Sequence, residues 1–213
     1  MRSFTTLATL SAALLTMSAP AAATTTVFAE TDDTWNVSGG PFADGPAQIV
    51  TDIPGSWGSA VPGTAWISTT TNGRNTTPGP YTFTKVFDLA NASSFNVLTA
   101  TWKSDNFIAD LFLNGTSLGA FTDFNQFGNV GPFSRTFDLG AVGASFQETD
   151  NTLQVIVQQR DLGNNNGNDM GLSGRFAAAV PEPATWMFMI FGFGAVGFAM
   201  RRQQKAKTRF QFA

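Results

Sequence analysis

The sequence contains no cysteine and no histidine in its 213 residues. Without cysteine no disulfide bond can form, so the fold must depend on a hydrophobic core. Without histidine the chain has neither a Ser-His-Asp triad nor a Cys-His dyad, and the usual zinc sites are also excluded. No motif assigns a general acid and a nucleophile, so we expect the protein not to be an enzyme.

A glycoside hydrolase is kept as a less favoured alternative, because folding could bring two carboxylates together. The candidate carboxylates are Asp32, Asp33, Asp105, Asp110, Asp123 and Glu148. We interpret each of them first as a surface or turn residue.

Positive charge is scarce in most of the chain. Residues 24–180 contain six Lys and Arg against fourteen Asp and Glu, a net charge of −8, whereas the whole chain has a net charge of −3. A domain this acidic is not attracted to nucleic acid or to anionic lipid.

The first 23 residues have the features of a secretory signal peptide. Met1 and Arg2 give a weakly positive start, and residues 4–17 are apolar apart from Ser and Thr. The run from Ala21 to Ala23 supplies the small residues that signal peptidase requires. We expect an N-terminal signal helix, cleavage after Ala23 with Ala21 as the alternative, and export of the rest.

A second apolar segment, residues 184–200, contains no charged residue. As a helix it would span about 25 Å, near the lower limit for a bilayer core. Arg201 and Arg202 follow it and could reach the headgroups, while Trp186 suits the opposite interface. We therefore predict a single transmembrane helix at 184–200 and a basic cytoplasmic tail at 201–213, rather than a helix buried in the core.

Pro181-Glu182-Pro183 stands immediately before this apolar segment. The motif, the Trp- and Met-containing segment and the Arg201-Arg202 pair together resemble the PEP-CTERM sorting signal. The resemblance implies cleavage near the motif by an exosortase, a membrane protease-transpeptidase of Gram-negative bacteria that make exopolysaccharide and biofilm. Residues 181–213 are thus expected to hold the protein in the inner membrane before processing, and to direct it to the cell surface or the extracellular space.

Between the two signals, residues 24–180 have the size of one domain. No stretch shows a sustained helical period, whereas several alternate apolar and polar residues between turn formers. Asn114-Gly115 between two apolar runs predicts a hairpin. The expected strands are residues 26–29, 35–37, 82–89, 96–103, 107–113, 117–121, 133–139, 153–159 and 171–179. In the fifth of these, alternation places Phe107, Ala109, Leu111 and Leu113 on one face.

Strands at this spacing, without helices between them, predict an antiparallel β-sandwich. The order of strands and turns over roughly residues 80–176 resembles a galactose-binding-like jelly roll, with Asn151-Thr152-Leu153 where that fold usually has Gly-Asn-Thr-Leu. Many carbohydrate-binding modules have this fold, so the resemblance implies sugar binding, although a fold alone does not decide function.

Exposed aromatic rings suit sugar binding, because sugar C–H faces stack on them. Trp57 and Trp66, flanked by Gly, Ser and Pro in connecting segments, are the candidate exposed pair.

The candidate metal site is an Asn- and Gly-rich loop whose oxygen donors suit calcium. Its candidate ligands are Asp161, Asn164, Asn166, Asn168 and Asp169, with Asp105 and Asn106 approaching from a neighbouring loop. A flexible polar loop without metal is the favoured alternative, because the spacing matches no defined calcium loop. No other cofactor is expected.

Together these features predict an exported cell-surface or extracellular-matrix protein that binds or organises exopolysaccharide in a biofilm. The main alternative is a structural or adhesive matrix protein without a discrete sugar site. The expected partners are signal peptidase, an exosortase-like membrane protease, extracellular polysaccharide and, before processing, the membrane.

Overall fold

The computed structural model describes residues 25–74, 77–121, 131–160, 169–180, 190–198 and 201. The described residues between 25 and 180 form one compact unit. Its strands are β1 Thr25–Glu30, β2 Asn36–Gly39, β3 Phe42–Pro46, β4 Gln48–Ile49, β5 Ile67–Ser68, β6 Gly79–Phe87, β7 Val97–Asp105, β8 Phe107–Leu113, β9 Thr116–Ser117, β10 Phe133–Asp138, β11 Asn151–Gln159 and β12 Gly171–Ala179. Its helical segments are the 3-10 turn η1, Ala92–Ser94, and the short helix α1, Leu139–Val142.

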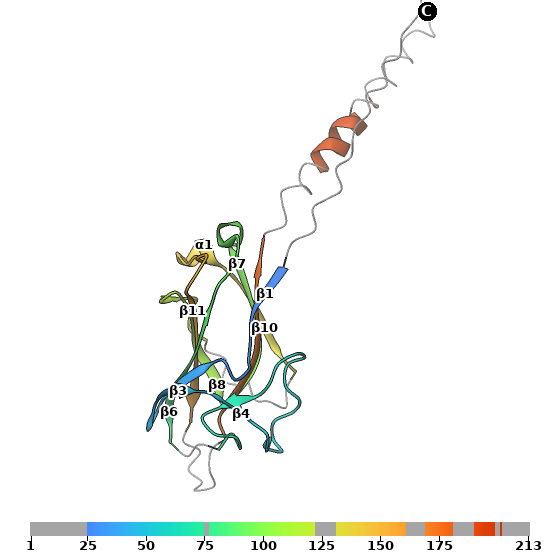
Figure 1. Ribbon diagram of the computed structural model, residues 1–213. Helices are drawn as coiled ribbons and strands as arrows, with labels where there is room; N and C mark the ends of the chain where they lie inside the picture. The colour runs from blue at the N-terminus through green and yellow to red at the C-terminus, as the bar shows by residue number, and fades with distance from the viewer. Residues whose placement is uncertain are drawn as a thin grey trace, which may run out of the picture. The chain divides into compact units, whose positions relative to one another are not determined.

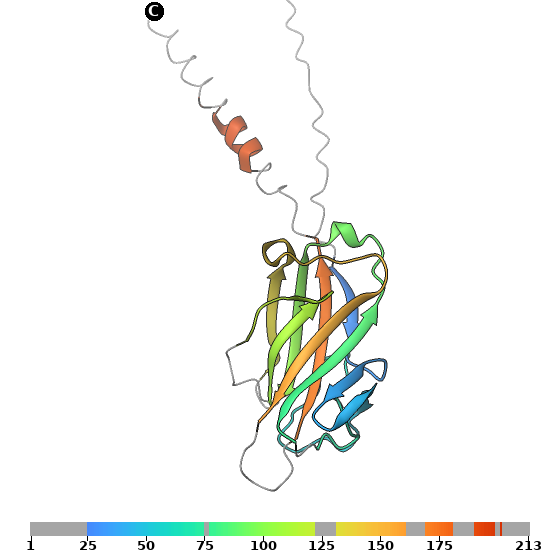
Figure 2. The same ribbon diagram turned by 90° about the vertical axis from the view of Figure 1, so that its left-hand side faces the viewer.

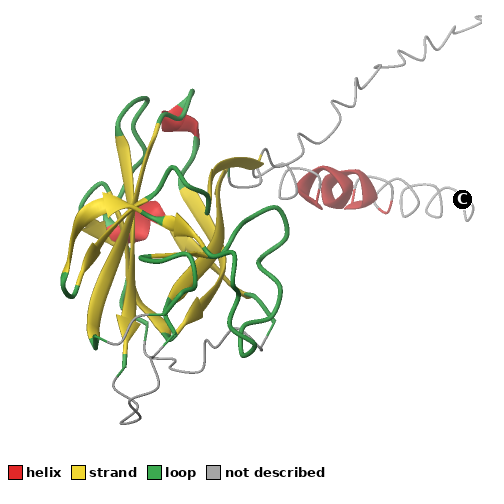
Figure 3. Cartoon of the chain, turned by 60° about the horizontal axis from the view of Figure 1, so that its bottom comes forward, coloured by secondary structure: helices red, strands yellow, loops and turns green. Residues whose placement is uncertain are grey.

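The strands form two antiparallel sheets that pack as two layers (Figures 1 and 3). Sheet A has the order β10-β7-β12-β5-β4, and β1 also pairs with β12; sheet B has the order β3-β2-β6-β11-β8-β9. Figure 2 shows sheet B facing the viewer. The predicted antiparallel β-sandwich is confirmed, while the finer jelly-roll resemblance stays a prediction.

The core lies between the sheets and is built from alternate residues of each strand. Leu98, Ala100 and Trp102 of β7 are buried, as the alternation predicts. Phe83 of β6 and Val155 of β11 are register partners in sheet B and are also buried. Burying a large apolar side chain stabilises a fold by about 1.5–3 kcal/mol, so this core provides the stability that disulfide bonds do not.

Strand β8 departs from simple alternation. Ile156 of β11 pairs with Asp110, whereas Val157 pairs with Ile108, so Ala109 is an extra residue in β8. The predicted inward position of Ala109 is therefore wrong: Ile108 is fully buried instead, and Ala109 is partly exposed. Such a β-bulge changes which residues face the core.

Three short strands at the sheet edges differ from the prediction. The sequence pattern does not predict β3 and β4, because β3 ends in Gly-Pro and both strands are largely exposed. The Asn114-Gly115 turn is confirmed, with φ angles of 51° and 79°. Strand β9 is shorter than the predicted strand at 117–121, because the chain beyond it leads to Phe121, which packs on Trp102 at 5.2 Å between ring centroids.

Outside this unit, residues 190–198 and 201 are helical. They belong to the segment predicted to span the membrane, and the remainder of that segment and the signal peptide lie outside the described residues. Within the part of the chain that the structure describes, no helix is long and apolar enough to cross a membrane. The transmembrane helix at 184–200 therefore stays a prediction.

Candidate functional sites

The two tryptophans predicted to be exposed are buried. Trp57 and Trp66 are each 1% exposed, and their rings pack with centroids 4.4 Å apart. Trp66 Nε1 donates to Gly58 O at 3.1 Å. The Trp57 ring is covered by Gly73 and Gly171, where any Cβ would lie within 2.7 Å of it. The prediction that this pair is exposed is wrong, because Gly73 and Gly171, which do not flank Trp57 in the sequence, leave the space into which its ring packs.

Asp105, at the end of β7, is the most strongly perturbed carboxyl group that the structure describes. Its side chain is buried, and its Oδ2 accepts a 2.6 Å hydrogen bond from Trp57 Nε1. Burial raises the pKa of Asp105 to about 6; the Trp57 hydrogen bond opposes this rise, and the negative charge of Asp169 adds to it. The pKa of Asp169 is also raised by burial, with Arg74 acting in the opposite direction. The two carboxylates predicted to meet are thus close enough to interact.

Asn106 lies beside this carboxylate pair in the chain and is 1% exposed. Its Nδ2 donates to Gln159 Oε1 at 3.0 Å, while its Oδ1 has no hydrogen-bond partner among the described residues. The other candidate calcium ligands, Asp161, Asn164, Asn166 and Asn168, lie outside those residues. Within them no group of three or more carboxylates is gathered for a metal ion, so the calcium site stays a prediction.

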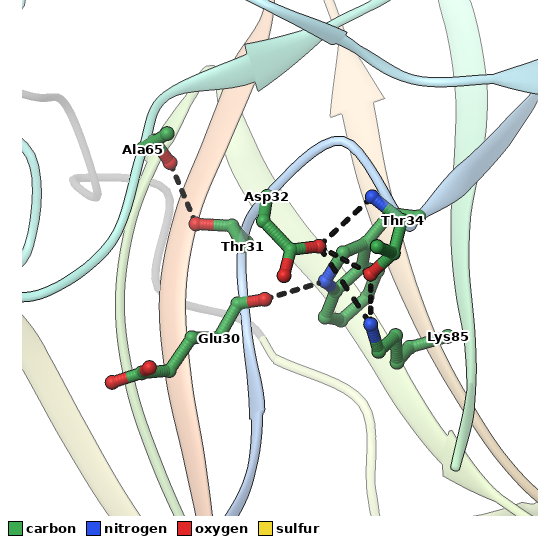
Figure 4. A network of polar contacts seen from close by, with 7 residues as sticks. Glu30, Thr31, Asp32, Thr34, Ala65 and Lys85 are labelled. Carbon is green, nitrogen blue, oxygen red and sulfur yellow. Dashed lines mark hydrogen bonds and ion pairs between the residues drawn. The ribbon is translucent and has the colours of Figure 1, made fainter.

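Figure 4 shows a polar network at the turn from β1 in sheet A to β2 in sheet B. Asp32 Oδ1 accepts hydrogen bonds from the backbone N–H of Thr34, at 2.9 Å, and from its hydroxyl, and Lys85 Nζ lies 3.6 Å away. Burial alone would raise the pKa of Asp32, but the Thr34 hydrogen bonds and the Lys85 charge outweigh it, so the pKa is lowered. Trp35 Nε1 and Thr31 Oγ1 donate to the carbonyls of Glu30 and Ala65 at 2.8 and 2.6 Å. Asp32 therefore stabilises the turn at which the chain passes from sheet A to sheet B.

Two other candidate carboxylates also bind the protein's own polar groups. Glu148 accepts hydrogen bonds from the backbone N–H groups of Asn91 and Ala92, both at 3.1 Å. Asp110 accepts from Ser117 Oγ at 2.8 Å. Asp123 lies outside the described residues. These contacts give Glu148 and Asp110 structural roles.

The outer face of sheet B carries a row of side chains that we did not predict as a site. Gln154 of β11 pairs with Thr84 of β6 on one side and with Phe112 of β8 on the other, and all three are partly exposed. In the adjacent row Ile156 lies between Thr82 and Asp110. An aromatic ring, an amide and a hydroxyl group therefore share one face over three strands, a width of about 10 Å. The alternating pattern of β8 could have predicted this row, because it places Phe112 on the other face of the sheet from the buried Leu111 and Leu113.

Strand β12 runs directly into the C-terminal segment. Its last residue, Ala179, pairs with Val97 of β7 and with Thr25 of β1. Residues 179–203 match the family model for the PEP-CTERM protein-sorting motif. The chain carries a PEP-CTERM sorting motif. No curated protein matches the chain.

The PEP-CTERM match confirms the resemblance predicted from Pro181-Glu182-Pro183 and the following residues. Such a motif indicates an exported protein that is anchored in a membrane before exosortase-type machinery processes it. Of the five residues assigned to sorting and membrane stop, Arg201 is helical. The other four, Pro181, Glu182, Pro183 and Arg202, lie outside the described residues.

A groove of about 700 Å³ lies where β1 begins and β12 ends, directly before the PEP-CTERM motif. We call it the β1–β12 groove. It is lined by Thr26, Val27, Phe28, Asp88, Leu89, Ala90, Asn91, Ser94, Phe95 and Val180. Val27 is 41% exposed, and Asp88 is the charged residue of the lining. The groove therefore presents apolar surface beside the point at which the chain leaves the domain.

Proposed function

We propose that the protein is exported, held in the inner membrane by its C-terminal segment, and released or transferred by an exosortase at the PEP-CTERM motif. Its β-sandwich then binds extracellular polysaccharide at the cell surface or in a biofilm matrix. The sorting motif supports the first part. The row of Thr84, Gln154 and Phe112 on sheet B supports the second.

The chemistry of this row suits a sugar chain better than the buried tryptophans do. A ring face accepts the C–H surface of a sugar, and an amide can donate to one hydroxyl group while accepting from the next. Ser117 pairs with Phe112 in the same row, and its Oγ donates at 2.8 Å to Asp110, which adds acceptor oxygens in the next row. The sheet holds these groups at fixed spacing, so little conformational entropy is lost when a ligand binds.

The test is calorimetric binding of residues 24–180 to the exopolysaccharide of the host. We expect saturable binding, weakened about tenfold by Phe112→Ala and by Gln154→Ala because each removes a direct contact. Phe42→Ala and Gln48→Ala, at exposed positions outside the row, are matched controls and should bind as the parent does. Binding that the controls weaken equally would contradict this site, and no binding at all would leave only the sorting function.

The structural matrix protein and the hydrolase, the two alternatives to a sugar-binding protein, predict different observations. A purely structural matrix protein predicts self-association that does not depend on glycan. A hydrolase predicts release of soluble product from the polysaccharide, lost when one carboxylate is changed. The contacts of Asp32, Asp110 and Glu148 favour neither carboxylate pairing nor cleavage.

We also propose that calcium binds at the end of the sandwich that carries Asp105 and Asp169. A divalent ion would offset the repulsion between the two carboxylates, and Asn106 Oδ1, which has no hydrogen-bond partner among the described residues, is a further oxygen donor. Calcium should then raise the melting temperature relative to a chelator, because it binds only the folded state. Asp169→Asn should reduce this increase and Asp44→Asn, at an exposed position, should not. An equal melting temperature with calcium and with chelator would favour a metal-free polar loop.

A further inference from the structure

We infer that the β1–β12 groove is the docking surface for the membrane protease that processes the PEP-CTERM motif. The inference rests on the proposed function in one respect, namely that an exosortase-type protease acts at or near residues 181–183. It adds that the protease binds the folded domain as well as the motif.

The Pro-Glu-Pro motif follows the last strand of the domain after a single residue, Val180. Ala179 is held by β1 and β7, Val180 lines the groove, and Pro181 is bonded to Val180. An extended chain advances by at most about 3.6 Å per residue, so Pro183 lies within about 11 Å of Val180 in any conformation. A protease that acts on the motif must therefore come close to the groove.

The lining of the groove is largely apolar. Val27 is 41% exposed and Val180 is partly exposed, while the buried Leu89 and Phe95 form further parts of the wall around a volume of about 700 Å³. Asp88 is the charged residue of the lining. The surface fits an apolar side chain or loop of the protease, with a neutral or basic group facing Asp88.

The groove exists only in the folded state. Its walls come from β1, from residues 88–95 and from Val180, which are far apart in the sequence. They meet only when β1 has paired with β12, where Thr25 lies opposite Ala179. A protease that docks here would therefore select chains whose exported domain has folded.

The test is processing of the full-length chain in its host, measured as release of a C-terminal epitope tag after pulse labelling. Ala90→Arg and Ser94→Arg place long side chains at exposed positions of the groove, and Ala43→Arg, on exposed β3, is the matched control. We expect about tenfold slower processing for the two groove variants and an unchanged rate for the control. Inserting a Gly/Ser spacer of about ten residues between Val180 and Pro181 should also slow processing, because the motif is no longer held beside the docked protease.

The outcomes separate this inference from the proposed function. Normal processing of both groove variants, or of the spacer variant, would overturn the docking surface. Restoration of normal processing to Ala90→Arg by the spacer would also overturn it, because the arginine would then be only a steric obstacle to the motif. A chain in which residues 181–183 are all changed to alanine should not be processed; if it is, the proposed sorting function itself fails.

Discussion

At the scale of single residues, Asp105 shows how a chain without histidine can respond to moderately acidic pH. Burial raises its pKa from the ordinary 3.8 to about 6. Trp57 Nε1 donates a 2.6 Å hydrogen bond to the carboxylate, which opposes this rise. At a pH between these two values, the folded state therefore keeps a proton on Asp105 that the unfolded state has released. The stability that Asp105 contributes is therefore fully present below about pH 3.8 and is lost as the pH rises through 6.

We predict that Asp105→Asn makes the domain about 2–3 kcal/mol more stable than the parent at pH 7, and leaves the two nearly equal at pH 4. An amide keeps an acceptor for Trp57 and carries no charge to bury. Urea unfolding at both pH values in the presence of a chelator measures the difference. A stability difference that is the same at pH 4 and pH 7 would contradict the assignment; Asp44→Asn is the exposed control.

A second residue-scale prediction concerns the glycine that makes room for Trp57. A Cβ at Gly171 would lie 2.3 Å from the Trp57 ring, whereas one at Gly55 would meet nothing within 4 Å. We expect Gly171→Ala to cost about 2–3 kcal/mol through overpacking, and Gly55→Ala to change stability by less than about 0.5 kcal/mol. Thermal unfolding of both variants compares them. If they melt together, the buried position of Trp57 is wrong.

At the scale of elements, the β8–β9 hairpin is fixed by one side chain as well as by its backbone. Asn114 adopts a positive φ of 51°, and its Nδ2 donates to Ser145 O at 2.9 Å and to Asn151 Oδ1 at 3.1 Å. Its Oδ1 accepts from the Thr152 N–H at 2.8 Å. Asn114 thereby ties the turn to the beginning of β11, which the hairpin signal in the sequence does not reveal.

We predict that Asn114→Gly destabilises the domain by about 2 kcal/mol, because glycine keeps the positive φ but loses these hydrogen bonds. Asn114→Ala should cost roughly 1 kcal/mol more, since it also disfavours the left-handed conformation. Denaturant titration ranks the parent and the two variants. If Asn114→Gly is as stable as the parent, the side-chain hydrogen bonds of Asn114 add nothing and only its positive φ matters.

The elements also show which parts of the structure the sequence can predict. The sequence predicts β12 at its observed bounds, 171–179, because this strand leads directly into a clear sorting signal. It does not predict the inward face of β8, because a bulge at Ala109 leaves no mark in an alternating pattern. The approach of Asp105 to Asp169 could be predicted because both are oxygen donors in or beside polar loops, whereas the burial of Trp57 depends on glycines 16 and 114 residues further along.

At the scale of the whole molecule, β12 is the central strand of sheet A, and it pairs with β1, the first strand of the exported domain. It pairs with β7 along its full length and with β1 and β5 on its other side. We predict that a chain truncated after Met170 does not fold, because sheet A loses its central strand, whereas one truncated after Val180 melts as the full domain does. Circular dichroism on heating tests both. A cooperative transition in the shorter chain would contradict the prediction.

The central place of β12 has a consequence for the timing of export. A secreted chain crosses the membrane from its N-terminus, so β1 is among the first strands outside and its partner β12 is the last. Until β12 emerges, sheet A has an open gap, and the chain stays loose enough to be threaded. When Ala179 pairs with Thr25, sheet A is complete. We therefore expect folding to be completed only when the sorting motif has reached the membrane.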